Sequence, residues 1–595
     1  MTATVGPIRG AAMPAAAIPR TRGTRGAPGW GGLWRRGLVG VLALVLAAVA
    51  GCDSPSPKPA PGPSGGTGGS GGASASAAGS GSAAPPASGS AVTLRVLAGS
   101  ELQDMQPILD DARKATGVNV QFTYTGTLDG ADTVTSGKAT GSYDALWFAS
   151  NRYLRLDPAG GANLLSETPV MVSPVALGVR SSELASLGWD PAKVTWSQIG
   201  QAVAAQKLTF GMTDPSRSNS GLSALVGLAS AFSGAQSALT QADVTKASPA
   251  LRQFFAGQQL TSGSSGWLAQ AYQRTAQGGS GVQVGALVNY ESVLLELNRT
   301  LPAAAQLTVI RPSDGVVSAN YPLTLLNSAS QPAKDAFQRL TAYLLRDDVQ
   351  RRISDETERR PVAAGVAPGA GLATDVRPEL PFPGSRAVAD ALLSAYQNQL
   401  RRPSRTVYVL DTSGSMAGAR LADLQAALTR LTGTGASGAV VPFRDREQVT
   451  LISFADAVKW EHTHDVPDQA PDAALAAIRS DVQSLSAGGG TAIYSTLEEA
   501  YKLVAQQQAA AQDDRFTSIV LMTDGESNEG ASDSDFATFY KALPPSGQAV
   551  PVFPILFGDA AKPQLQGIAD TTGGQLFDGA SGDLSSVFEE IRGYQ

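Results

Sequence analysis

Short apolar runs alternate with amphipathic segments along the C-terminal third of the chain. The runs are apolar on both faces, as in parallel strands that helices cover on both sides, and the segments between them have a helical period. This pattern predicts strands at 405–410, 448–454, 457–461, 516–522 and 551–557, and helices at 419–431, 472–484, 492–510, 533–543, 560–571 and 583–592. Strands that alternate with helices imply a doubly wound, Rossmann-like α/β sheet with right-handed crossovers.

A second α/β pattern lies between residues 92 and 365. It predicts strands at 92–97, 118–124, 143–148, 170–179, 282–290 and 321–327, helices at 102–116 and 222–232, and a charged helical end at 333–360. Residues 366–400 hold a Pro/Gly-rich linker and a helix at 387–400, which either packs on the C-terminal domain or joins the two domains. The ordered chain is therefore expected to form two α/β domains, 92–365 and 401–595.

The strand predicted at 405–410 ends in a cluster of side chains that carry oxygen. Asp411 follows the apolar run directly, and Ser413 and Ser415 flank Gly414, which lets the loop bend tightly. Open α/β sheets place their binding crevices at the carboxyl ends of their strands. A carboxylate with two neutral hydroxyls is a hard-oxygen donor set, which suits Mg²⁺ and suits soft metals poorly.

Two further fragments supply matching donors. Thr491 follows the glycines at 488–490 and precedes the helix predicted from 492. Asp524 follows a second apolar strand, which runs from Ser518 to Met522. Both residues come at a strand end or in a glycine-rich loop, the same kind of position as Asp411.

Together these residues resemble the metal-ion-dependent adhesion site (MIDAS) of the von Willebrand factor type A family, whose pattern is D-x-S-x-S, a distant Thr and a distant Asp. The resemblance implies a metal site made of Asp411, Ser413, Ser415, Thr491 and Asp524. It implies Mg²⁺, or Mn²⁺ or Ca²⁺ in its place, and a protein partner that offers a carboxylate to the metal. Two carboxylates roughly neutralise the ion, and Mg²⁺ keeps waters that a partner's carboxylate can replace.

Other interpretations of Asp411 and its neighbours fit less well. An EF-hand loop needs Gly at position six and Glu at position twelve, where this chain has Met416 and Ala422. A helix-capping role for Asp411 leaves the other two fragments unexplained. Ser415 is a poor candidate for a nucleophile, because it lacks the G-x-S-x-G setting and an obvious histidine base. We therefore expect that the protein is not an enzyme.

The order of elements in 92–365 resembles the type II periplasmic solute-binding proteins of ABC importers, as does the stretch Thr213-Asp-Pro with Ser218-Asn-Ser220-Gly221. The resemblance implies two lobes that close on a solute. A helix N-terminus from each lobe favours an anionic or strongly polar ligand, because its N–H groups and dipole face the cleft. The cleft candidates are Ser100, Ser150, Ser218, Ser220 and Tyr290, and capping of helices explains each serine equally well.

The first 51 residues have the pattern of an export signal. Arginines and no acids precede an apolar run at 37–50, which is short for a membrane span. The run closes on Val49-Ala50-Gly51-Cys52, which resembles the lipobox of bacterial lipoproteins, with Cys52 as the lipidated residue. A signal anchor with an incidental cysteine is the alternative. Arg35-Arg36 also leaves twin-arginine export open, and Met13 is a second candidate start.

Composition and charge limit the classes of partner. Residues 52–91 are almost entirely Gly, Ser, Ala and Pro, which predicts a flexible tether. Cys52 is the only cysteine, so no intrachain disulfide stabilises either domain. Without the signal's six arginines the chain has 39 basic and 51 acidic residues, a net charge near −12. This acidity argues against nucleic acid and anionic lipid as partners.

The chain is therefore expected to be a lipoprotein on the extracytoplasmic face of the membrane. Its C-terminal domain would bind a protein through a metal, and its first domain would bind a solute. The alternative function is the substrate-binding component of an ABC-type transporter, with a permease as partner. His462 and His464 share one strand face, and either bind a metal or lie at an exposed strand end.

The predicted anchor is tested by Cys52→Ala. We expect the variant to move from the membrane fraction to the medium without a change in fold, because a diacyl anchor gives stable attachment where one chain does not. Fractionation followed by immunoblotting measures this. Unchanged membrane retention would contradict lipidation.

Overall fold

Strand β13 (Ser404–Asp411), which is buried along its whole length, lies in the middle of the C-terminal sheet. The sheet has six strands in the order β15-β14-β13-β16-β17-β18. β13 pairs in parallel with β14 and β16, and β15 is an antiparallel edge strand. The other strands are β14 (Gln448–Phe454), β15 (Val458–Asp465), β16 (Phe516–Thr523), β17 (Val552–Leu556) and β18 (Phe577–Asp578). The predicted doubly wound α/β fold is confirmed.

Successive residues of β13 face two different helical layers. Tyr408 and Leu410 are buried with α14 (Ala419–Arg430), α15 (Asp472–Ser484) and α20 (Leu584–Arg592). Val407 and Val409 are buried on the other face, with α16 (Ile493–Ala511), α17 (Asp533–Ala542) and α19 (Lys562–Thr572). The short elements are η4 (Gly414–Met416) and α18 (Pro545–Gln548). The strand is apolar on both faces because it separates two cores.

The first lobe of the N-terminal domain holds a five-stranded sheet in the order β2-β1-β3-β11-β4. Its strands are β1 (Val92–Ala98), β2 (Val118–Tyr124), β3 (Ala145–Trp147), β4 (Leu164–Pro169) and β11 (Pro322–Leu326). Its helices are η1 (Ser100–Met105), α1 (Gln106–Thr116), α2 (Thr127–Thr135), α3 (Arg152–Arg155), α4 (Pro158–Ala162), α11 (Gln331–Leu344) and α12 (Asp347–Thr357).

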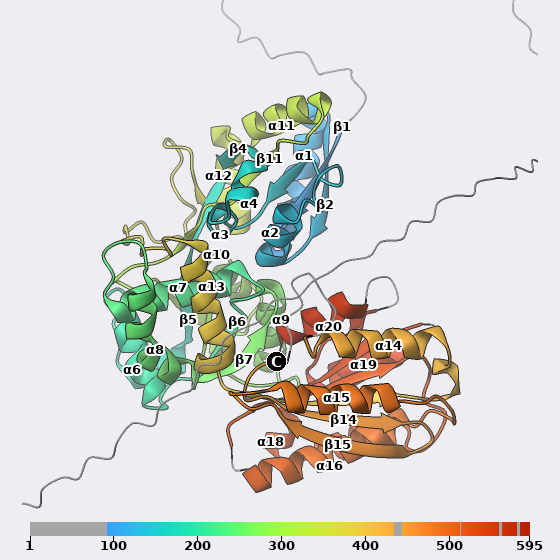
Figure 1. The fold of residues 1–595 in the computed structure, drawn as a ribbon. Helices are drawn as coiled ribbons and strands as arrows, with labels where there is room; N and C mark the ends of the chain where they lie inside the picture. The colour runs from blue at the N-terminus through green and yellow to red at the C-terminus, as the bar shows by residue number, and fades with distance from the viewer. Residues whose placement is uncertain (1–91, 434–442, 512, 559–561, 580–583, 595) are drawn as a thin grey trace, which may run out of the picture. The chain divides into compact units, whose positions relative to one another are not determined.

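The second lobe is built on a separate sheet with the path β10-β5-β8-β6-β7, to which β9 and β12 add at β5. Its strands are β5 (Met171–Arg180), β6 (Phe210–Thr213), β7 (Gln258–Ser262), β8 (Ala286–Tyr290), β9 (Leu307–Ile310), β10 (Ser318–Ala319) and β12 (Arg360–Pro361). Its helices are α5 (Ser181–Leu187), α6 (Trp196–Ala204), α7 (Asn219–Ser233), α8 (Gln241–Phe255), α9 (Ser265–Ala276), α10 (Glu291–Asn298) and η2 (Ala303–Ala305). The chain crosses between lobes at Val170, and returns between β10 and β11 (Figure 1).

The domain has elements that the sequence pattern does not predict, among them α2, α5 and α6. The pattern predicts no element between 233 and 281, where the structure has α8, β7 and α9; Pro249 lies inside α8 and interrupts its helical signal. The helix predicted at 387–400 is α13 (Arg386–Ala395), extended by a π turn (Tyr396–Leu400). It packs on α8, because Leu392 is buried in the same cluster as Phe254, and it thus belongs to the second lobe.

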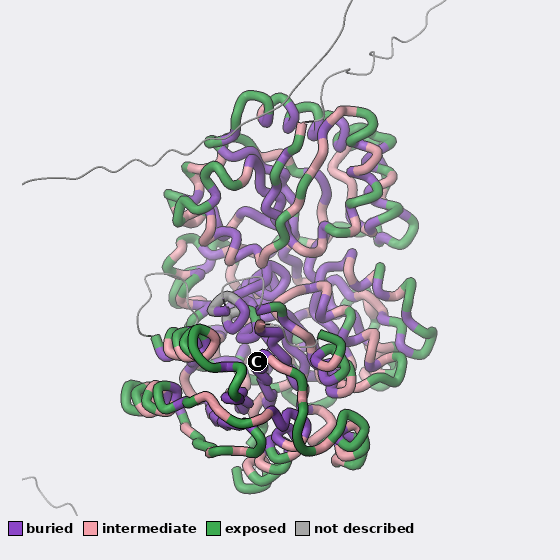
Figure 2. Tube along the Cα trace, turned by 90° about the vertical axis from the view of Figure 1, so that its right-hand side faces the viewer, coloured by how far each residue is buried: buried purple, intermediate pink, exposed green. Residues whose placement is uncertain are grey.

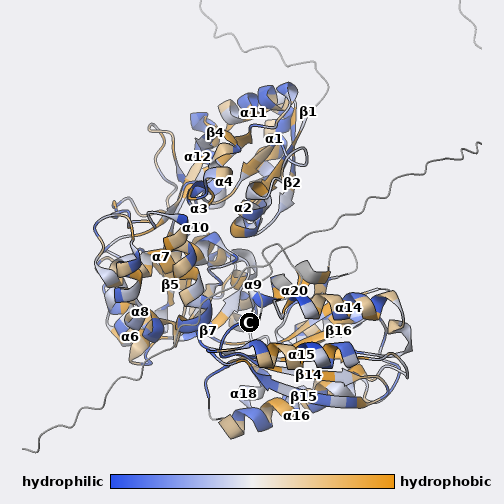
Figure 3. Ribbon diagram, viewed as in Figure 1, coloured by the Kyte–Doolittle hydropathy of each residue, from blue (hydrophilic) through white to orange (hydrophobic). Residues whose placement is uncertain are grey.

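Burial follows the layers. The strands lie in the buried interior, and exposed residues follow the outer sides of the helices (Figure 2). Hydropathy alternates along many helices in the same way (Figure 3). The structure describes residues 92–433, 443–511, 513–558, 562–579 and 584–594, so the predicted signal, Cys52 and the tether lie outside the described residues. Among those ranges, no helix has the length and apolar character needed to cross a membrane.

An aromatic cluster joins the second lobe to the C-terminal domain. The ring of Trp267 on α9 meets that of Tyr594 edge to face, with centroids 4.7 Å apart. Tyr594 also contacts Phe553 of β17 and Phe577 of β18. One continuous hydrophobic core therefore runs from the second lobe into the C-terminal sheet.

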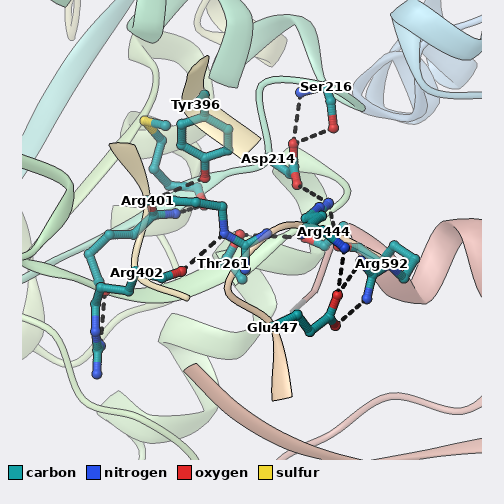
Figure 4. A network of polar contacts seen from close by, with 12 residues as sticks. Asp214, Ser216, Thr261, Tyr396, Arg401, Arg402, Arg444, Glu447 and Arg592 are labelled. Atoms are coloured by element: carbon teal, nitrogen blue, oxygen red, sulfur yellow. Dashed lines mark hydrogen bonds and ion pairs between the residues drawn. The ribbon is translucent and has the colours of Figure 1, made fainter. Parts of the chain in front are cut away.

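Buried ion pairs reinforce this junction (Figure 4). Asp214, in the loop between β6 and α7, accepts a hydrogen bond of 3.1 Å from Arg444 of the C-terminal domain. Arg444 also donates to the backbone carbonyl of Arg592, whose own guanidinium donates to Glu447 at 2.8 Å. All four side chains are at most 4% exposed. Removal of any one of them would therefore leave an opposite charge buried without its partner.

The junction is tested by Arg444→Met, which leaves Asp214 as a buried charge without this guanidinium. We expect a loss of about 3–5 kcal/mol in the free energy of unfolding, measured by chemical denaturation. Arg346→Met is the matched control, because its ion pair with Asp348 is exposed and should contribute less than about 1 kcal/mol. Equal effects of the two substitutions would contradict the structural role of the junction.

Candidate metal centre and solute cleft

The C-terminal sheet brings two acids together at its topological switch point. From β13 the chain continues to β14 on one side and later returns to β16 on the other side. β13 ends in Asp411, and Asp524 directly follows the neighbouring parallel strand β16. Such a point opens a crevice outside the carboxyl ends of the strands, because the adjacent connections diverge there.

Asp411 is fully buried and held on both carboxylate oxygens. Oδ1 accepts a hydrogen bond of 2.7 Å from the backbone N–H of Ser413, and Oδ2 accepts one of 2.6 Å from the hydroxyl of Thr523. Desolvation by burial raises the pKa of Asp411, the hydrogen bonds lower it, and the negative charge of Asp524 raises it further. A cation at this point would favour the ionised form.

Ser415 connects Ser413 to Asp524. Its hydroxyl lies 3.1 Å from that of Ser413 and donates to Asp524 Oδ1 at 2.7 Å. The hydroxyl of Thr491 faces the same space: a Cβ added to Gly525 would lie 3.8 Å from the Ser415 hydroxyl and 3.9 Å from the Thr491 hydroxyl. The structure therefore brings all five predicted donors into one cluster.

The glycine loop that carries Thr491 is fixed from two sides. The Asn528 side chain accepts from the backbone N–H of Thr491 at 2.8 Å. Asp456 accepts from the N–H of Gly490 at 2.8 Å. Gly489 has φ of 98°, and a Cβ there would lie 1.9 Å from the Asp456 carboxylate, so only glycine fits.

Lys459, on the edge strand β15, is a positioning residue that the sequence did not indicate. Its ammonium donates to the carbonyls of Thr412, Ser486 and Gly488 at 2.9 to 3.0 Å. It thus ties the Asp411 loop to the loop that leads to Thr491. Burial lowers the pKa of Lys459, and the negative charges of Asp456 and Asp411 raise it.

The donor set fits a hard divalent cation. Two carboxylates that are at most 3% exposed face one another, with hydroxyls between them and the exposed Ser415 at the rim. Oxygen ligands with a total charge of about −2 match what Mg²⁺ takes in proteins. Hydroxyls supply three of the five donors. In the described part of the chain, no three or more His, Cys, Asp or Glu residues gather as a metal site.

The two histidines have a different environment. His462 Nδ1 lies 3.0 Å from Asp481, and His464 Nε2 lies 2.6 Å from the same carboxylate. β15 is the edge strand of the sheet, and Asp481 belongs to α15, which packs on it. These contacts favour a structural role for the pair.

The candidate cleft residues of the second lobe lie around the start of α7. Ser218 is the N-cap residue, although its side chain makes no capping hydrogen bond. The hydroxyl of Ser220 is buried among those of Thr213, Ser218 and Ser265, at 2.7 to 3.0 Å. This packing indicates that Ser220 fixes the loop. Tyr290 ends β8, and its hydroxyl accepts from Asn219 at 2.8 Å.

The first lobe contributes two candidates. Ser100 begins η1 directly after β1, and is partly exposed. Ser150 is buried, and its hydroxyl accepts a hydrogen bond of 3.2 Å from the backbone N–H of Arg152. That bond gives Ser150 a local role at the start of α3.

Several charged and aromatic residues also lie together between the lobes. The sequence pattern does not predict this group, because its members come from segments that are far apart in the chain. The guanidinium of Arg359 lies 4.9 Å from the ring of Tyr321, and donates to Asp104 and to the carbonyl of Glu101. Tyr321 has φ of 40°, a strained conformation for a bulky residue, and its ring lies 6.0 Å from that of Tyr290. Burial raises the pKa of Glu101, with Asp104 adding to the effect.

The lobes also touch at the N-terminal end of α2. Asp129 on the first lobe pairs with Arg217 on the second at 3.3 Å. A Cβ on Gly126 would lie 2.5 Å from the carbonyl of Arg217, so the two lobes approach closely here. Asp129, which contacts the loop 214–218 through Arg217, is therefore a cleft residue that the predicted set of serines and Tyr290 did not include.

Comparison with known families agrees with this geometry. Residues 94–356 match the model for bacterial extracellular solute-binding proteins, and residues 407–590 match that for the von Willebrand factor type A (VWA) domain. The chain joins an extracellular solute-binding domain to a VWA domain. The solute-binding family implies an extracytoplasmic location.

Individual relatives are distant. An uncharacterized protein of Synechocystis sp. (strain ATCC 27184 / PCC 6803 / Kazusa) is 32% identical over 133 residues, which cover 22% of this chain and 28% of that relative. Similar solved structures include the periplasmic binding protein AfuA from Actinobacillus pleuropneumoniae, with TM-score 0.42, 12% identity and coverage of 52% of this chain and 99% of that one. A ferric binding protein from Campylobacter jejuni has TM-score 0.37 and 11% identity, with coverage of 50% and 96%.

The role of Lys459 is tested by Lys459→Met, which keeps the apolar stem and loses the three donated hydrogen bonds. We expect faster amide hydrogen exchange in residues 412–416 and 486–491, and a loss of about 1–3 kcal/mol in the free energy of unfolding. Lys502→Met is the control, because that ammonium pairs with Glu499 and lies over the Phe539 ring on the surface of α16, and donates to neither loop. Unchanged exchange in both loops would contradict the positioning role.

Proposed function

We propose that the VWA domain binds a protein partner through a divalent cation held by Asp411, Ser413, Ser415, Thr491 and Asp524. The observation that carries this proposal is the approach of two buried acids, with hydroxyls between them, at the switch point of the sheet. When bound, Mg²⁺ would supply an electrophilic centre that accepts a carboxylate from the partner. Mn²⁺ or Ca²⁺ would serve the same donors.

The chain's own residues prepare this site. Hydrogen bonds from Ser413 and Thr523 hold the Asp411 carboxylate in one orientation. Lys459 fixes the loops on either side of it. Pre-positioned ligands lose little conformational freedom on binding, which supports a site formed before the partner arrives.

We further propose that the solute-binding domain takes a small polar solute, and that Cys52 anchors the protein to the outer face of the membrane. The contact between Asp129 and Arg217 supports two lobes that close on each other. Near Tyr321, Asp104 already pairs with Arg359 and burial raises the pKa of Glu101, so a neutral polar group suits this part of the cleft better than the anion favoured by the helix N-termini. Delivery of the solute to an ABC permease is the alternative role.

The metal-dependent function is tested with Asp411→Ala and Asp411→Asn in the full chain. Wild type should gain stability with Mg²⁺, by about 2.7 kcal/mol at a hundredfold excess over the dissociation constant, because only the folded site binds the ion. Asp411→Ala should abolish this gain, and Asp411→Asn should weaken it strongly. Calorimetry measures both, and EDTA should remove the gain in wild type.

Partner capture is measured on the same proteins with cell-surface extract, with and without EDTA. Asp468→Ala removes an exposed carboxylate of the same domain and serves as the control, with wild-type behaviour expected. Retention of Mg²⁺ binding by Asp411→Ala, or equal capture in EDTA, would rule out the adhesion-site mechanism.

A further inference from the structure

A guanidinium already contacts the candidate metal centre. Arg420, in the first turn of α14, donates to Asp524 Oδ2 at 2.5 Å. The other oxygen of Asp524 accepts from Ser415 at 2.7 Å. Asp524 has no exposed side-chain surface, whereas the Arg420 side chain is 34% exposed, so the guanidinium covers the acid from the solvent side.

The backbone leaves space for this arginine. Gly558, directly after β17, has φ of 63°, and a Cβ there would lie 3.0 Å from the Arg420 guanidinium. Gly418, with φ of 86°, turns the chain from the Ser415 loop into α14. A side chain at Gly558 would require the guanidinium to shift by a few tenths of an ångström, and the positive φ also favours glycine there.

The charges at the centre make the arginine and a metal ion competitors. Both are cations, and both require an oxygen of Asp524 that faces the centre. A divalent ion beside a guanidinium at hydrogen-bond distance from the same carboxylate meets strong repulsion, which the largely buried site screens poorly. Occupation by one therefore lowers the affinity for the other.

We propose that Arg420 is an internal competitor for the metal, which neutralises Asp524 in the metal-free domain and moves off it when the ion binds. This inference rests on the proposed metal-dependent function. Arg420 then lies at the rim beside the exposed Ser415, where its guanidinium adds a contact for the partner's carboxylate. Metal and arginine together would select a carboxylate that bridges the two.

The experiment compares wild type with Arg420→Gln and Arg420→Lys in the full chain, since the VWA core is continuous with the second lobe. Mg²⁺ affinity is measured by isothermal titration calorimetry, and the thermal midpoint is measured in EDTA and in excess Mg²⁺. Lys541→Gln is the control, because it removes the same charge from an exposed position on α17.

Arg420→Gln should bind Mg²⁺ about tenfold more tightly than wild type. The substitution removes the positive charge of the guanidinium that pairs with the Asp524 carboxylate in wild type. In EDTA its thermal midpoint should fall, because two buried acids then face each other without the guanidinium. Arg420→Lys should lie between the two, and Lys541→Gln should match wild type in both measurements.

Mg²⁺ affinity of Arg420→Gln that equals or falls below that of wild type would overturn the competition. Wild type that binds no Mg²⁺ while Arg420→Gln binds it would support the competition and contradict the proposed function of the wild-type domain. If neither binds Mg²⁺, both the competition and the proposed function fail. If both bind equally, the function stands and only the competition fails.

Discussion

The buried ion pair between Asp214 and Arg444 ties the solute-binding domain to the VWA domain. Asp214 begins the loop that leads into α7, and its carboxylate also accepts hydrogen bonds from Ser216 at 2.6 and 2.7 Å. Arg444 is held in turn by the backbone of Arg592. Removal of either partner leaves a buried charge, so this ion pair couples the stability of the two domains.

The loop that carries Asp214 contacts both domains. The loop that Arg444 holds also carries Arg217, which reaches across to Asp129 of the first lobe. One loop therefore contacts the first lobe through Arg217 and the VWA domain through Asp214.

Charge compensation governs the metal centre as well. Asp411 and Asp524 are both buried, and each of their four carboxylate oxygens accepts a hydrogen bond from the chain. The domain offsets the second charge with Arg420, and a divalent ion would offset both. If the proposed function holds, the centre would be neutralised by one of two cations, one supplied by the chain and the other by the solvent.

The sequence by itself determined the doubly wound VWA fold and the strand ends at Asp411 and Asp524, because apolar runs on both faces and acids at their ends are local signals. It also pointed to Thr491, through a glycine loop. Only the tertiary structure decided that Lys459 and Arg420 act on that centre, since β15 and α14 reach it through folding. The cleft is the part that the sequence predicted least well. Its serines are local signals of helix starts, whereas its charged residues come from segments that are distant in the chain. Those charges meet only when two lobes pack, and no local pattern records this.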